Sequence, residues 1–193
     1  MCGIAGIIDF KGRGIDPQVL DSMTASMVHR GPDDKGSFQD SFVGLGFRRL
    51  SIIDVEGGHQ PMSNEDDSIY LIFNGEIYNF KGIRDQLIGL GHTFKSQADS
   101  EIILHAYEQW GNDCVKRFNG IIGFALYDQK KRKVLLARDH LGDKPLYYAR
   151  ENGRLLFASE MKGILAHPDF ERRPSLPALS SYLTFRYPQG DQP

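Results

Sequence analysis

The sequence predicts an α+β fold in which antiparallel strands form stacked layers with helices around them. Four strand-like segments follow one another between residues 123 and 159, and the short connectors "QKKR" and "ENG" are typical of hairpin turns. Helical patterns are grouped before and after this run, which argues against a βαβ arrangement. The runs "YLIF" and "VLLA" are almost continuously apolar, which indicates strands that are covered on both faces.

Helices are predicted at five places by apolar spacing and by their start and stop residues. An acidic cap and a proline, Asp16 and Pro17, precede the first, and apolar residues spaced by three and four mark the next two, which stop at Gly91 and Gly111. The predicted helices cover residues 18–28, 80–90, 100–110, 160–166 and 176–185.

Strands are predicted where apolar and β-branched residues cluster between turn signals. The segment "IAGII" near the start would bury as a strand, and "IYLIF" is expected to end at a turn formed by Asn74 and Gly75. "RRLSIID" reads as a strand with a basic flank. The predicted strands cover residues 4–8, 48–54, 69–73, 123–128, 133–139, 145–151 and 154–159.

Composition and charge exclude several classes of protein. The chain has 193 residues, of which 40% are hydrophobic and 25% charged, with a formal net charge of −2. This balance gives no electrostatic case for binding nucleic acid or an anionic membrane. No apolar stretch approaches the roughly 18 residues of a membrane helix, and no secretory signal precedes the first strand. Two cysteines without a signal peptide favour a reducing, cytoplasmic location.

A cysteine directly after the initiator methionine is a candidate nucleophile. If Met1 is removed, the Cys2 thiol and a free α-amine lie on one residue. An α-amine has a pKa of about 7.7–8.0, so a fair fraction is neutral at cellular pH and can act as a general base. One residue then supplies both nucleophile and base, and no separate histidine is needed.

Three further segments carry candidate binding residues, each with a plain structural alternative. Asn74 and Gly75 offer the two donor types of an oxyanion hole, although Asn-Gly is also a common turn. Arg49 on a strand could grip a carboxylate with two parallel hydrogen bonds. Asp99 could accept a hydrogen bond from an ammonium group, or could cap the helix that follows it.

Other chemistry-bearing residues predict no additional site. The six histidines show no spacing typical of metal ligands, so no metal site is expected. "GLGFRR" is not followed by a phosphate-binding pattern, and there is no Walker loop. Cys114 follows Trp110 on a helical stretch and is interpreted as a packing residue.

The motifs together resemble a known family. In order, the chain contains "MCGIAGII", "HRGPDDKG", "RRLSIID", "HQPM", "NGEIYN", "ADSEIIL", "FNGIIGFALYD", "LLARDHLGDKPLYY" and "FASEMKGIL". It resembles the N-terminal glutaminase domain of asparagine-synthetase-type (glutamine-hydrolysing) enzymes, which are class II glutamine amidotransferases with an N-terminal nucleophile. The resemblance covers about residues 2–170 and implies a four-layer αββα sandwich of two antiparallel sheets, the Ntn hydrolase fold.

The resemblance also implies roles for individual residues. Cys2 would be the nucleophile, with Asn74 and Gly75 as the oxyanion hole. The substrate's α-carboxylate would meet Arg49, with backbone help from Ile52 and Ile53. Its α-amino group would lie near Asp99 and Glu76. Where the family usually has Ser or Thr before this aspartate, the chain has Ala98, which removes a hydroxyl but leaves the carboxylate.

The function that the resemblance implies is hydrolysis of L-glutamine to glutamate and ammonia. The ammonia would supply the nitrogen for an ATP-dependent amidation. Residues 171–193 are expected to be a linker and the start of a missing C-terminal synthetase domain, which would bind ATP and Mg²⁺; this chain itself is expected to need no cofactor. The acceptor could be aspartate, for asparagine biosynthesis, or a sugar carboxylate in surface-polysaccharide synthesis. Alternatively, the chain could be a non-catalytic regulatory or dimerisation module. A homodimer is one assembly that it could form.

Overall fold

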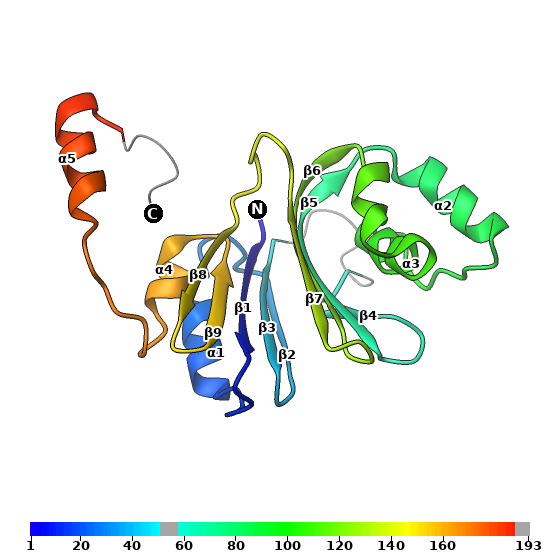
Figure 1. Ribbon diagram of the computed structural model, residues 1–193. Coiled ribbons are helices and arrows are strands. Elements are labelled where there is room, and N and C mark those ends of the chain that lie inside the picture. Colours follow the sequence, from blue (N-terminus) through cyan, green and yellow to red (C-terminus); the bar gives the residue numbers. More distant parts are fainter. Residues whose placement is uncertain (51–57, 188–193) are drawn as a thin grey trace.

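The computed structural model describes residues 1–50 and 58–187, and within them nine strands form two antiparallel sheets (Figure 1). The five-stranded sheet has the order β2 (Asp34–Gln39), β3 (Val43–Arg49), β1 (Gly3–Asp9), β9 (Arg154–Ala158) and β8 (Tyr147–Glu151). The four-stranded sheet has the order β4 (Met62–Ser63), β5 (Ile69–Ile77), β6 (Gly120–Asp128) and β7 (Lys133–Arg138).

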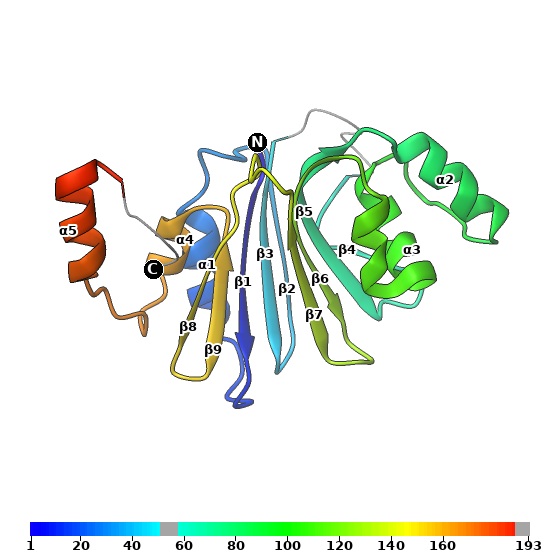
Figure 2. The ribbon, with the colours of Figure 1, turned by 45° about the horizontal axis from the view of Figure 1, so that its top comes forward.

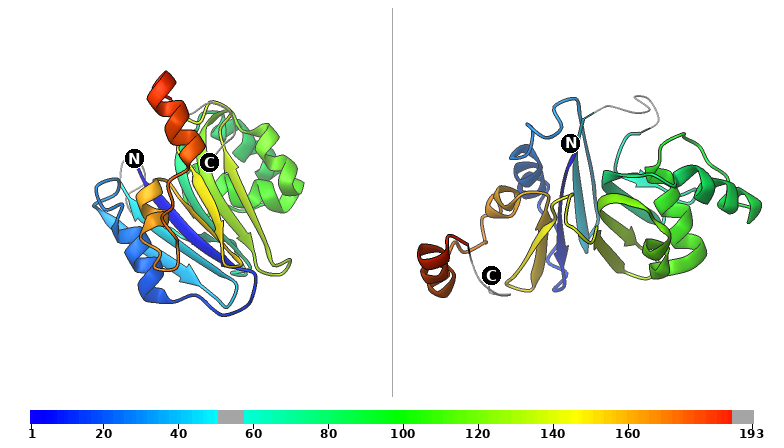
Figure 3. Two further views of the ribbon diagram at one scale, coloured as in Figure 1. Left: turned by 60° about the vertical axis from the view of Figure 1, so that its left-hand side comes forward. Right: turned by 90° about the horizontal axis from the view of Figure 1, so that it is seen from above.

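The two sheets stack face to face, and helices cover their outer faces (Figures 1 and 3). On the five-stranded sheet lie α1 (Pro17–Ala25) and α4 (Met161–Leu165). On the four-stranded sheet lie α2 (Phe80–Gly89) and α3 (Ser100–Trp110), with the 3₁₀ helix η1 (Gly111–Arg117) after α3. This is the expected αββα sandwich.

The last helix differs from the other four. Helix α5 (Leu176–Phe185) spans the residues that the sequence predicts, but it buries none of its side chains and stands off from the sandwich (Figures 1 and 2). Within the described residues, no helix has the length and apolarity that crossing a membrane requires. The boundary proposed at residue 170 stays a prediction.

Strand alternation sends successive side chains to different layers. On β1, Ile4 and Ile8 enter the layer between the sheets, whereas Ala5 and Ile7 pack beneath α1 and α4. On β5 the even-numbered Ile72 enters the layer between the sheets, and its odd-numbered neighbours pack beneath α2 and α3. A residue's position on a strand therefore fixes the layer that it enters.

Several local predictions are confirmed. The Asp16 side chain caps α1 by accepting a hydrogen bond from the Gln18 N–H at 2.8 Å. Asn152 and Gly153 both have positive φ (50° and 78°), which the hairpin turn between β8 and β9 requires. Cys114 is fully buried, in the core beneath α2 and α3.

Three predictions need correction. β5 does not end at Asn74 and Gly75 but continues to Ile77, because β6 pairs with it along its whole length. Leu90, the last of the apolar residues whose spacing predicts the helix over 80–90, is expected to be buried with them but is 55% exposed. Of the strand predicted over 48–54, the first two residues end β3, and residues 51–54 lie outside the described residues.

Strands β2 and β4, the first five residues of β3 and helix η1 have no counterpart among the predicted elements. β3 is hidden by its glycines, which weaken a strand pattern. A Cβ at Gly46 would lie 2.1 Å from Thr24 Oγ1, and one at Gly44 would lie 2.8 Å from Ile15 Cγ2. The glycines therefore allow α1 to pack closely on the sheet.

Candidate active site

A cavity of about 140 Å³ is lined by Met1 and Cys2, just before the first residue of β1. Figure 2 shows the N-terminus at this end of the strand. The cavity exceeds what a single water needs and suits a small molecule. Six of the eight residues predicted for the site line it, and Ile52 and Ile53 lie outside the described residues. The six are Cys2, Arg49, Asn74, Gly75, Glu76 and Asp99.

Strand pairing explains why residues so distant in sequence meet. β1 and β3 pair Gly3 with Arg48, so the ladder's next pair is Cys2 with Arg49. Cys2 lies two residues before Ile4, and Arg49 two residues after Phe47, so each shares a strand face with that apolar residue. Both Ile4 and Phe47 lie between the sheets. Asn74 continues the same face of β5 two residues after Ile72. Side chains from three strands thus enter one end of the layer between the sheets.

The backbone of Cys2 is held by an arginine that the sequence analysis did not select. Arg30 Nε donates a hydrogen bond to the Cys2 carbonyl at 2.9 Å, and Arg30 Nη1 donates to Glu160 Oε1 at 3.0 Å. Burial raises the pKa of Glu160, but hydrogen bonds from His29, Arg30 and Lys162 outweigh it and lower the pKa to about 2. Glu160 is therefore charged at neutral pH and anchors Arg30.

Asn74 carries an unused donor. The residue is only 2% exposed, and its Nδ2 has no hydrogen-bond partner among the residues that the structure describes. A buried donor without a partner costs free energy, so such groups call for an explanation. An anionic oxygen of a bound molecule would supply the missing acceptor.

The backbone N–H of Gly75 is directed toward the same edge of β5. The N–H groups two residues before and two residues after Gly75 point away from β6. Phe73 N–H donates to Gln60 Oε1 at 2.6 Å, and Ile77 N–H donates to Asp99 Oδ2 at 2.9 Å. Alternation places the Gly75 N–H on that side too. A Cβ at Gly75 would lie 2.3 Å from the Ile121 carbonyl oxygen, so only glycine fits there.

Asp99 occupies the N-cap position of α3, yet its side chain makes no cap hydrogen bond. Of the two roles that the sequence left open, the geometry therefore does not support capping. The carboxylate instead accepts the Ile77 N–H, and it lies partly exposed at the cavity. Burial raises the pKa of Asp99, and the nearby Glu76 charge raises it further.

Besides Arg30, which holds the Cys2 carbonyl, several residues that line the cavity do not stand out in the sequence. Gln60 is buried and holds the Phe73 N–H, and Lys144 enters from the segment between β7 and β8. Gln60 belongs to the "HQPM" motif, which was noted without a role. Met1 also lines the cavity and is 55% exposed.

Comparisons with known proteins agree with this geometry. The family model described as "Glutamine amidotransferase domain" matches residues 1–193. Asparagine synthetase [glutamine-hydrolyzing] 3 of Bacillus subtilis is 43% identical over 183 residues, which cover 93% of this chain and 30% of that protein. Asparagine synthetase B [glutamine-hydrolyzing] of Escherichia coli is 39% identical over 168 residues, covering 86% and 30%.

Solved structures show the same fold. Glutamine phosphoribosylpyrophosphate amidotransferase from B. subtilis superimposes with a TM-score of 0.71 at 19% sequence identity, covering 89% of this chain and 45% of that one. This likeness confirms the expected Ntn hydrolase fold. The chain spans only about 30% of the length of the curated relatives named above.

Proposed function

This chain belongs to the glutamine amidotransferase domain family, and we propose that the Cys2 thiolate is the nucleophile that releases ammonia from L-glutamine. The observation that carries the proposal is the buried Asn74 Nδ2, a donor without a described partner in the cavity that Cys2 lines. Acyl transfer needs such a donor, aimed at the oxygen that becomes negative in the transition state.

The proposed reaction forms and breaks one covalent bond to Cys2. The thiolate attacks the side-chain carbonyl carbon of glutamine, and the oxygen takes the negative charge between Asn74 Nδ2 and the Gly75 N–H. The Cys2 α-amine takes the thiol proton and passes it to the departing nitrogen, which leaves as ammonia. Water then cleaves the thioester, which gives glutamate and restores the thiol.

Recognition of glutamine is proposed to use the charged side chains of the cavity. The guanidinium of Arg49 would bind the α-carboxylate, helped by backbone groups of Ile52 and Ile53. Asp99 and Glu76 would attract the α-ammonium group. This combination selects a free α-amino acid over other amides.

The ammonia is proposed to serve a C-terminal synthetase domain, since the relatives extend well beyond the matched region. ATP and Mg²⁺ would bind in that domain, and this chain would need no cofactor. Aspartate is the proposed acceptor, in asparagine biosynthesis, with a sugar carboxylate as the alternative. The proposed location is cytoplasmic, and the full-length protein could form a homodimer.

The two cysteines provide a matched test. Cys2→Ala should lower glutamate release from glutamine on the order of 10³-fold or more while the chain stays folded. Cys114→Ala should keep the activity, because Cys114 is fully buried and burial raises the pKa of its thiol to about 11. Glutamate release by Cys2→Ala well above background would overturn the proposal.

The α-amine requires a second measurement. With Met1 in place the Cys2 nitrogen is an amide, which cannot accept a proton, and Met1 lines the cavity. General base catalysis contributes typically ~10²–10⁴-fold, so activity should scale with the fraction of processed chain measured by mass spectrometry. Full activity in a homogeneous sample that retains Met1 would place the base elsewhere.

A further inference from the structure

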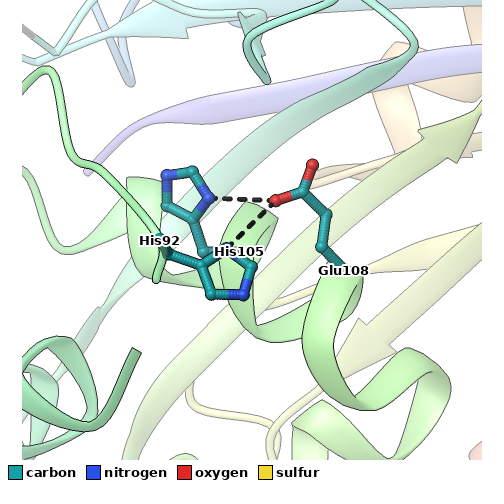
Figure 4. A group of neighbouring side chains, drawn as sticks. All are labelled: His92, His105 and Glu108. Carbon is teal, nitrogen blue, oxygen red and sulfur yellow. Dashed lines mark hydrogen bonds and ion pairs between the residues drawn. The ribbon is translucent and has the colours of Figure 1, made fainter. Parts of the chain in front are cut away.

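Two histidines and a glutamate converge on the outer helical layer, outside the cavity described above. One ligand atom each from His92, His105 and Glu108 lies within 4.8 Å of the other two. Glu108 Oε2 is 3.0 Å from His105 Nδ1 and 3.5 Å from His92 Nδ1. Figure 4 shows both imidazole rings turned toward this carboxylate.

The backbone fixes each of these side chains. His105 and Glu108 lie three residues apart on α3, so they share one face of that helix. His92 follows the C-terminal end of α2, where Gly91 has a positive φ of 97°. Its N–H donates to the Leu87 carbonyl at 3.0 Å, in the hydrogen-bond pattern of a Schellman motif. The three groups are thus brought together by rigid elements, although thirteen residues separate the histidines.

Two of the three side chains are also held at their far ends by hydrogen bonds, whereas His105 Nε2 has no hydrogen-bond partner among the described residues. His92 Nε2 lies 3.1 Å from Gln109 Oε1, and the second oxygen of Glu108 accepts from Asn64 Nδ2 at 2.8 Å. His105 Nε2, on a residue that is only 1% exposed, lies 3.6 Å from Glu101 Oε1. Such partners orient metal ligands and fix which ring nitrogen carries the proton.

We propose that His92 Nδ1, His105 Nδ1 and Glu108 Oε2 bind a divalent transition-metal ion of the zinc type, with water as the fourth ligand. Tetrahedral zinc with bonds of about 2.0–2.2 Å places neighbouring ligand atoms about 3.3–3.6 Å apart. The 3.5 Å separation lies in this range, and the 3.0 Å separation is slightly shorter. Two imidazoles and one carboxylate suit zinc better than calcium or magnesium, which prefer oxygen ligands. No local sequence motif marks this site, because the two histidines lie far apart in the chain.

The ion would join the segment between α2 and α3 to α3 itself. That segment leads directly to Asp99, which lines the cavity, and Glu101 already holds it by accepting from the N–H groups of Lys95 and Ser96 at 2.7 and 2.8 Å. We therefore expect metal binding to stabilise this layer.

Calorimetric titration with Zn²⁺ tests the site. The Cys2→Ala chain, treated with a chelator and desalted, is the background, because it removes the thiol as a competing ligand. One ion should bind per chain, and Co²⁺ should give visible d–d absorption without a sulfur charge-transfer band. Zinc should also raise the Tm of this chain.

Matched variants decide the outcome. His92→Ala keeps the backbone N–H that the Schellman motif uses, so it should fold, and it should lose zinc binding. Gln109→Ala should weaken binding about 10–100-fold. His140→Ala removes an exposed histidine elsewhere and should change nothing. If no ion binds, or if binding survives His92→Ala in a folded chain, the cluster is an imidazolium–carboxylate ion pair and the proposal is wrong.

Discussion

The two ends of β1 each lie near an aspartate, and the surroundings of the two carboxylates differ. Half-buried Asp99 lines the cavity at the Cys2 end, and Asp9 ends the strand at the other. Asp9 is fully buried, and its carboxylate accepts from the Lys11 N–H at 2.9 Å, Arg13 Nε at 3.2 Å and Arg154 Nε at 3.1 Å. Burial raises the pKa of Asp9, but these hydrogen bonds outweigh it, so the pKa lies below its usual value.

The cavity end lacks this compensation. Burial and the Glu76 charge raise the pKa of Asp99, and the Asn74 amide has a donor with no described partner. Burial by itself therefore does not mark a functional group. Where the fold satisfies a charge with its own arginines, the charge stabilises the fold. Where it leaves donors and charges uncompensated, the proposed ligand would complete them.

The largest effect is expected at the unused donor. Asn74→Ala should lower kcat for glutamine about 10²–10³-fold, because one oxyanion donor is lost. It should leave the Tm almost unchanged, since no described protein hydrogen bond to Nδ2 is lost. Glutamate release and thermal denaturation measure the two.

Asn79 is the matched control for this substitution. Its amide is satisfied on both sides, donating to the Arg117 carbonyl and accepting the Asn119 N–H, each at 2.9 Å. Asn79→Ala should therefore lower the Tm and keep kcat. If Asn74→Ala instead lost stability and kept activity, the donor would be structural.

A stability effect is expected at the other end of β1. Asp9→Asn removes the buried carboxylate that Arg13 and Arg154 share, and because both arginines are partly exposed the loss should be that of charge-assisted hydrogen bonds, about 1.5–3 kcal/mol. Urea unfolding should show this loss, while kcat/KM for glutamine should stay within a few-fold of the original. A large loss of kcat/KM in folded Asp9→Asn would show that the two ends of β1 are coupled.

A smaller effect on activity is expected at the arginine of the cavity. Arg49→Lys replaces a planar fork by a point charge, and losing a charge-assisted hydrogen bond of roughly 1.5–3 kcal/mol should lower kcat/KM at least about tenfold. Arg48→Lys is the control, because Arg48 has the opposite parity and donates to the Gly31 carbonyl at 3.0 Å. Equal losses in both variants would argue against a specific role for Arg49.

The sequence predicts the chemistry of the site better than its assembly. Cys2, Arg49 and Asn74 stand out by residue type and local motif, yet their convergence depends on β3, whose glycines hide it from a strand pattern. The Asn-Gly pair is a turn signal in isolation, but pairing with β6 keeps it within a strand. Propensity is weak where tertiary pairing opposes it.

Residues that act through the backbone were not predictable. Arg30 holds a carbonyl 28 residues away, and Gln60 holds an N–H 13 residues away. Neither contact leaves a periodic signal in the sequence, because the partner is a main-chain group that every residue possesses. His92 and His105 escape for a different reason, since only the packing of α2 against α3 brings their side chains together.

The smallest expected effect is a change in Tm, and it distinguishes Asp9 from Asp99 most directly. Replacement by asparagine should lower the Tm at Asp9 and raise it at Asp99. A carboxylate whose pKa is raised in the folded state stabilises the fold below its unfolded pKa, near 3.8, and loses that contribution as pH rises through the folded pKa. Ionised Asp99 therefore lowers the free energy of unfolding at pH 7. Asp99→Asn, which can still accept the Ile77 N–H, should raise the Tm slightly while it lowers kcat/KM for glutamine.

The pH dependence checks the cause of this gain. As pH falls through the raised folded pKa of Asp99, this carboxylate becomes protonated in the original chain, so the Tm difference from Asp99→Asn should shrink. The loss caused by Asp9→Asn should persist further into acid, because the folded pKa of Asp9 is lowered and its contribution is lost only as pH falls below about 3.8. A lower Tm for Asp99→Asn at pH 7 would mean that the Asp99 charge has a stabilising partner in the fold, and that the contrast between the two ends of β1 does not hold.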